Sequence, residues 1–270
     1  SYVVPFMAIA YVLIALVVLA LNITEVPAML ATIVQSAVGL EPAAGGVTGG
    51  VAAAMLNGVK RGLFSNEAGM GSAPNIAACA TPQPHHPASQ GFVQALGVFI
   101  DTLVICTVTA LIILLSGVFE PGSGLTGTKL TQAALSDHIG IAGDYFIALA
   151  ILFFAFTSII GNYSYAENAL TYWGLGGRTP VMVLRGAVLA MVIWGTLQTV
   201  QTVFNTADAS MGLMATINLV AIVLLSGTVA KLTRDYFAQR RAGREPQFHG
   251  RDFPELADKV EHDIWWRERR

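Results

Sequence analysis

The stretch from Gly58 to Asn75 carries the residue types best suited to binding chemistry in an otherwise apolar sequence. It reads GVKRGLFSNEAGMGSAPN and places the polar triplet Ser65, Asn66 and Glu67 among glycines. Glycine permits unusual backbone dihedrals and a close approach of other atoms. Glycines alone would suit tight packing of membrane helices, so the polar triplet in their midst favours a binding site.

The longer segment from Ala43 to Thr81 predicts a helix that is broken inside a membrane. It is long enough to cross a bilayer, but its glycines and charges do not fit a regular lipid-facing helix. We expect the first half to end between Ser65 and Ser72 and a short second half to start near Pro74. The carbonyl end of such a break attracts a cation and the N–H end an anion, so an amino acid zwitterion would satisfy both.

The candidate substrate-binding residues are the polar, glycine and neighbouring positions of this break. The hydroxyl and amide side chains can supply hydrogen bonds, and Glu67 could meet an ammonium group or a cation. The set comprises Ser65, Asn66, Glu67, Gly69, Met70, Gly71 and Ser72.

The composition is that of an all-α membrane protein. Hydrophobic residues make up 54% of the chain, charged residues only 12%, and the mean hydropathy is +0.61. A soluble domain carries about 25% charged residues, and a net charge of −2 gives no sign of nucleic-acid binding. With the broken segment we expect about six transmembrane crossings, the others being 3–23, 91–117, 145–161, 180–203 and 209–230. The connections 25–38 and 130–138 have the pattern of short helices.

The distribution of basic residues predicts the orientation. Most of the fifteen Lys and Arg residues lie at or after Lys231, so residues 233–270 are expected to form a cytoplasmic tail and 1–232 a transmembrane domain. The expected location is the inner membrane, with several crossings surrounded by lipid. An apolar run starts at once after Ser1 with no basic region before it. We therefore expect the chain to start inside a larger protein.

Two stretches carry a family resemblance. GVKRGLFSNEAGMGSAPN followed by HPASQGFVQALGVFIDTLVICT closely resembles the sodium:alanine symporter family, also called alanine or glycine:cation symporters, most strongly over residues 57–116. The later FAFTSIIGNYSYAE and DFPEL fit more loosely. The resemblance implies a LeuT-type architecture of two inverted five-helix repeats. This chain would hold the last helix of the first repeat and the whole second repeat, with the missing N-terminal helices as its partner.

The resemblance also implies sodium-coupled symport of a small amino acid, alanine or glycine, with Na⁺ as the co-transported ion. It implies that a hydroxyl pair on the third helix of the second repeat helps to coordinate sodium, and Thr157-Ser158 matches that pair in type and place. The alternative for both residues is hydrogen bonding to carbonyls one turn earlier in their own helix. Asp101 lies near the middle of its span and either lines the ion path or pairs with Lys60 or Arg61.

Other functions remain open at this point. A proton-coupled carrier would use Glu67 or Asp101 as the titrating group, and an ion channel would line its pore with the glycine-rich break. A membrane enzyme would need a nucleophile and base or a metal cluster within the spans, whereas all five histidines fall in predicted loops or the tail. We do not expect an enzyme. The pair His85-His86 is expected to lie in a solvated loop.

Overall fold

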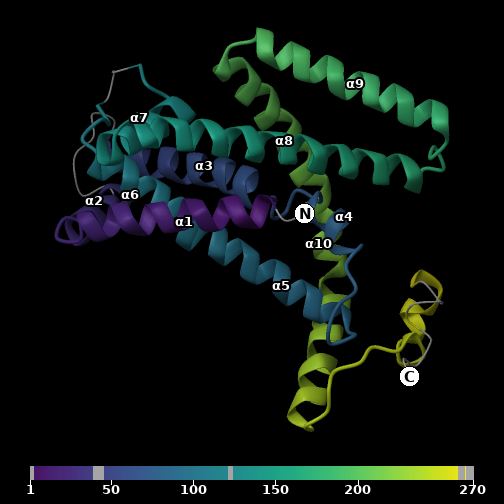
Figure 1. Cartoon of the computed structure of the whole chain (residues 1–270). Coiled ribbons are helices and arrows are strands. Elements are labelled where there is room, and N and C mark those ends of the chain that lie inside the picture. The colour runs from purple at the N-terminus through teal and green to yellow at the C-terminus, as the bar shows by residue number, and fades with distance from the viewer. Residues whose placement is uncertain (1–2, 39–45, 121–123, 261–264, 266–270) are drawn as a thin grey trace. The chain divides into compact units, whose positions relative to one another are not determined.

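The computed structural model describes residues 3–38, 46–120, 124–260 and 265. Residues 43–45 of the expected broken segment and part of the expected tail lie outside this range. Every regular element of the described residues is helical, which confirms the all-α class (Figure 1). The helices are α1 Val3–Leu21, α2 Val26–Val38, α3 Gly46–Asn66, α4 Ala73–Ala77, α5 Pro87–Ile100, the π-helix η1 Asp101–Cys106, α6 Thr107–Leu115, α7 Thr128–Ile139, α8 Ile141–Tyr172, α9 Arg178–Leu197 and α10 Val200–Arg241, followed by the 3₁₀ turns η2 Gly250–Asp252 and η3 Pro254–Lys259.

The number of candidate membrane spans is lower than the six expected. Among the described residues, four helical segments are long and apolar enough to cross: Pro87–Leu115, Ile141–Tyr172, Arg178–Leu197 and Val200–Arg241. A fifth is possible if α1 and α2, which are bent by 104° at their junction, count as one broken span. The segment α3 is not among them, because its glycines and the charges of Lys60 and Arg61 lower its hydropathy.

The predicted position of the break and the two predicted short helices are confirmed, whereas α8 and α10 extend well beyond the predicted 145–161 and 209–230. Helix α3 ends at Asn66 and α4 begins at Ala73, so the break lies where the glycines and polar residues placed it. The expected short helices at 25–38 and 130–138 are α2 and α7. Helix α10 continues to Arg241, past the expected start of the tail at residue 233.

The described residues form two compact units. Unit 1 consists of Ser1–Asn66 and Phe99–Asp208, and unit 2 of Glu67–Val98 and Ala209–Arg270. Within unit 1, helices α1, α6, α7 and α8 pack side by side (Figure 1). The apolar faces of these helices meet in a shared core. Its buried residues are Tyr11, Ala15, Val18, Val108, Ile112, Ala134, Leu135 and Ile147.

In unit 2, the tail packs against the C-terminal part of α10. Gln239 of α10 forms two hydrogen bonds of 2.9 Å with the backbone of Gln247, and the Phe248 amide donates to the His85 carbonyl at 2.9 Å. The side chain of Phe248 is only 2% exposed. Buried apolar surface and paired backbone groups therefore fix the start of the tail on the loop that precedes α5.

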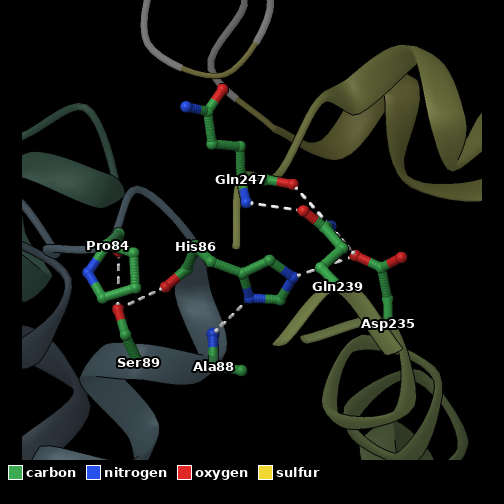
Figure 2. A network of polar contacts seen from close by, with 7 residues as sticks. All are labelled: Pro84, His86, Ala88, Ser89, Asp235, Gln239 and Gln247. Atoms are coloured by element: carbon green, nitrogen blue, oxygen red, sulfur yellow. Dashed lines mark hydrogen bonds and ion pairs between the residues drawn. The ribbon is translucent and has the colours of Figure 1, made fainter. Parts of the chain in front are cut away.

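His86 lies at the centre of this contact, and the expectation of a solvated loop is wrong for it. Its side chain is fully buried, with the rings of Tyr236 and Phe248 against it edge to face. Figure 2 shows the imidazole between its own loop and α10: Nε2 lies 3.3 Å from Oδ2 of Asp235, and Nδ1 accepts the Ala88 amide at 3.1 Å. A ring nitrogen that accepts carries no proton, so the imidazole is neutral in this arrangement.

We expect the contact between tail and loop to weaken in mild acid. Burial lowers the pKa of His86 below its ordinary 6.5, although Asp235 works in the opposite direction and His85 adds to the lowering. The unfolded or undocked state then binds more protons than the docked state. The stabilisation is complete above about pH 6.5 and declines as the pH falls from there towards the lower docked value. The hydrogen exchange of the Phe248 amide, corrected for its intrinsic rate, should speed up between about pH 7.5 and 5.5.

The matched variant is His86→Asn, in which Oδ1 can replace Nδ1 as acceptor for the Ala88 amide without titrating in this range. Its Phe248 protection should show no step near neutral pH. An equal step in wild type and variant would assign the effect to a group other than His86.

Candidate functional site

The end of α3 in unit 1 is bonded to the π-helix. Ser65 donates its hydroxyl hydrogen to the carboxylate of Asp101, and Asn66 Nδ2 donates to Thr102 Oγ1 at 2.9 Å. The residues that the sequence placed at the break and the acid that it placed at mid-span are thus brought together. Their oxygens lie at the carbonyl end of a helix of 21 residues, where the helix dipole places partial negative charge.

The π-helix explains how Asp101 can face this end. It interrupts the apolar helix that runs from α5 to α6, and the wider turn shifts the faces of the two flanking helices. Thr107 Oγ1 donates to the Thr102 carbonyl five residues earlier at 3.2 Å, which helps to satisfy the backbone of the wider turn. Single π-turns inside α-helices are frequent at functional sites, and no proline or charge pattern in the sequence would have revealed this one.

Asp101 also lines a cavity of about 440 Å³ within unit 1. The wall is mainly apolar, and Phe154 of α8 is among its lining residues. Its polar groups come from four segments and belong to Asp101, Tyr11, Thr109, Thr128 and Thr131. Tyr11 and Thr109 are joined to each other through their hydroxyl oxygens at 2.6 Å. A small number of polar groups in an apolar hollow is the usual composition of a small-molecule or ion path.

Lys60 and Arg61 have a partner that the sequence did not indicate. Arg61 grips both carboxylate oxygens of Asp208 at 2.7 and 2.8 Å, and Lys60 Nζ lies 3.9 Å from the same carboxylate. The guanidinium also lies over the ring of Phe204, 5.0 Å from its centre. These contacts make the Asp208 carboxylate a partner of both cations.

The break itself begins unit 2 with an unusual backbone. Glu67, directly after the last residue of α3, has φ of +50°, the left-handed conformation in which helices often end but which a residue other than glycine seldom adopts. Gly69 and Gly71 follow with φ of +87° and +85°. Three left-handed residues within five positions turn the chain out of the helix, and two of them require glycine.

The remaining residues of the break are buried within unit 2. Met70 is 8% exposed and Ser72 is 5% exposed, and the Ser72 hydroxyl has no hydrogen-bond partner among the described residues. Asn218 of α10 donates Nδ2 to the Gly69 carbonyl at 2.9 Å. The second half-helix, α4, has only five residues, so its dipole is small and the anion-attracting end expected there is weak.

Thr157 and Ser158 lie in α8 of unit 1. The Thr157 hydroxyl donates to the carbonyls of Phe153 and Phe154 at 2.8 and 3.1 Å, the bonding within its own helix that the sequence left open as an alternative. Such a hydroxyl keeps its oxygen lone pairs, so this bonding does not exclude a cation. Ser158 is exposed and follows Phe154 by four residues, which places it on the helix face that reaches the cavity.

Sequence reasoning missed Asp208 and Asn218, and it named His86 only as a residue of a solvated loop. Each is a polar or charged residue in or beside an apolar segment, the kind of position that marks function or structure in a membrane protein. That signal was present for Asn218, which is surrounded by apolar residues in the sequence. The partner of each residue lies more than 140 positions away along the chain, so the pairing itself had no local signature.

The long apolar helices are those of a multi-pass membrane protein. Residues 1–250 match the sodium:alanine symporter family, and the chain belongs to that family, as the motifs around the break indicated. The family is one of transporters and not of enzymes.

Several curated relatives illustrate its range. The amino-acid carrier protein AlsT of Bacillus subtilis is 49% identical over 94% of this chain and 53% of its own length. The probable sodium/glutamine symporter GlnT of the same organism is 48% identical, over 90% and 49% respectively. A sodium/proton-dependent alanine carrier protein of a Bacillus species is 36% identical, over 92% and 58%. The chain thus spans about half the length of these relatives.

Proposed function

We propose that this chain forms the second half of a sodium-coupled symporter for a small amino acid, alanine or glycine. The observation that carries the proposal is the cluster of Ser65, Asn66, Asp101 and Thr102 at the carbonyl end of α3. Family membership and the sodium or alanine in the names of relatives support it. Preceding helices of the same protein would supply the other half of a LeuT-type pair of inverted repeats.

The unit 1 cluster is the proposed cation end of the transport site. It combines a carboxylate, two hydroxyls, an amide group and the last carbonyls of a long helix, which together favour a hard cation with oxygen ligands. Sodium or the ammonium group of the substrate meets these requirements. Thr157 and Ser158 on α8 are the proposed further sodium ligands. Within unit 2, the backbone from Gly69 to Ser72 and the Ser72 hydroxyl are proposed separately as groups that contact substrate.

The proposed placement is the inner membrane, with residues 233–270 on the cytoplasmic side. The clustered Lys and Arg residues of the tail support this orientation. The expected boundary at residue 232 would lie within α10, so the helix would extend beyond the bilayer into the cytoplasm.

The deciding experiment is uptake by the full-length transporter in proteoliposomes. An inward sodium gradient should drive accumulation of labelled alanine or glycine, and replacing sodium with choline should abolish it. Asp101→Asn should strongly reduce uptake, because it removes the negative charge from the cation end while keeping the shape. Labelled glutamine belongs in the same assay, because one relative is named for it. Absence of sodium-dependent uptake of all three amino acids would refute the proposal.

Proton coupling is the second candidate, favoured by the name of one relative, a sodium/proton-dependent alanine carrier. Uptake driven by a pH gradient in sodium-free medium would support it. Conduction of many ions per opening, seen as single-channel currents, would instead identify a channel.

The backbone at Glu67 allows its side chain to be tested separately. Glu67→Gly should leave the fold intact or slightly more stable, because glycine adopts the observed φ of +50° without strain. If the carboxylate meets a cation during transport, uptake should nevertheless fall by tenfold or more, about 1.4 kcal/mol or more in binding. Uptake of alanine and thermal unfolding should be measured on the same preparation.

Glu67→Gln is the matched control, since it keeps the length of the side chain and the backbone strain. It should lose uptake as Glu67→Gly does. Normal uptake by the glycine variant would show that Glu67 only ends α3.

A further inference from the structure

Asn218 is a polar residue in an apolar part of α10, and its side-chain amide contacts the broken segment of unit 2. Helix α10 around it is lined by exposed apolar residues such as Ile217 and Leu219, whereas Asn218 is half-buried. Its Nδ2 donates to the Gly69 carbonyl at 2.9 Å. An amide in such a helix is costly unless it is bonded, so its position is set by this partner.

The same side chain also accounts for one of the glycines. A Cβ added to Gly71 would lie 3.0 Å from both Cγ and Oδ1 of Asn218. That is closer than real Cβ atoms normally approach, and the neighbour here is a short side chain held by its own hydrogen bond. Gly71 therefore serves two purposes, since it adopts φ of +85° and leaves room for the amide.

Asn218 thus bonds to the break at the Gly69 carbonyl and occupies the space that a side chain at position 71 would need. Between them lies Met70, which is almost fully buried, and next to them is Ser72 with its buried hydroxyl. The Ser72 hydroxyl has no partner among the described residues, so it is available to a polar group that reaches this segment.

We propose that Asn218 is a positioning residue of the transporter, which fixes the backbone from Gly69 to Ser72 in the form that receives substrate. This inference rests on the proposed function. Without the amide, the break adopts other conformations as well, and the apparent affinity for substrate falls in proportion to the fraction of transporter that keeps the binding conformation. A high substrate concentration returns the transporter to the binding conformation.

The test uses Asn218→Leu, which keeps a similar size without a donor, and Asn218→Asp, which keeps the shape but not the N–H. Both should raise the alanine concentration for half-maximal uptake by about tenfold or more, while the maximal rate per inserted transporter recovers at high alanine. Ser226→Ala is the control on the same helix, because its hydroxyl bonds only to the Val223 carbonyl of its own turn. It should leave both values unchanged.

A second measurement needs no transport. Hydrogen exchange of a peptide covering residues 68–76 should be faster in both Asn218 variants than in wild type and Ser226→Ala, because the amides of Met70 and Asn75 are bonded within this turn. Unchanged exchange together with an unchanged half-saturating concentration would overturn the inference. A lower maximal rate alone, with the half-saturating concentration unchanged, would also overturn it and indicate a folding defect. If wild type takes up no amino acid, the proposed function fails, and exchange alone still decides whether Asn218 holds the break.

Discussion

Thr157→Val and Ser158→Ala are each expected to raise the sodium concentration needed for half-maximal uptake by about tenfold to a hundredfold. Each change removes one hydroxyl oxygen from α8 and keeps most of the side-chain volume. Losing one of several oxygen ligands costs about 1–3 kcal/mol, the usual penalty for a buried polar partner left unsatisfied. Ion and substrate binding are linked, so the apparent affinity for alanine should fall at low sodium and recover at high sodium.

The measurement is a sodium titration of alanine uptake, normalised to the transporter inserted in the membrane. Ser164→Ala is a suitable control, because its hydroxyl also bonds to a carbonyl of the preceding turn of α8, at 2.9 Å, but lies farther along the helix. A shift for Thr157 and Ser158 without a shift for Ser164 would identify the ion ligands. Superimposable curves would leave the Thr157 hydroxyl with the role that the structure shows, bonding within its own helix.

Helix identities were predictable because they depend on local pattern. The apolar runs, the glycines and Pro74 placed the break and the shorter helices within a few residues, but not the ends of the long helices α8 and α10. The sharp bend between α1 and α2 was not predicted as part of one span, because no proline lies at the junction itself and the polar residues there read as a loop. Helix α3 was expected to cross as a broken span, but it is not among the candidate spans of the described residues, because its glycines and charges lower its hydropathy.

The candidate site was predictable in composition and not in pairing. Ser65 and Asn66 were chosen from residue type, and Asp101 from its depth in a span, but their contact depends on how α3 packs against the π-helix. His86 shows the opposite error. A histidine in a short polar loop reads as solvated, and only the return of the tail, more than 140 residues later, buries it. Contacts of this kind have no periodic signal in the sequence.

Gly71→Val is expected to abolish uptake while the protein remains in the membrane. Valine resists φ of +85°, and its branched Cβ would also enter the space that Asn218 occupies, 3.0 Å from the amide. The backbone strain and the clash both disfavour the conformation of the break that is proposed to receive substrate. The measurement is alanine uptake together with the amount of inserted protein.

Gly62→Val separates this effect from a general loss of small residues. Gly62 lies within α3, and an added Cβ there meets no described atom within 4 Å. Valine is a better helix former than glycine and meets no neighbour there, so most uptake should remain. Equal loss in the two variants would mean that glycines in this stretch act by close packing against other helices. Normal uptake by Gly71→Val would remove the break from the transport site, and the polar cluster around Asp101 would then have to account for substrate binding without it.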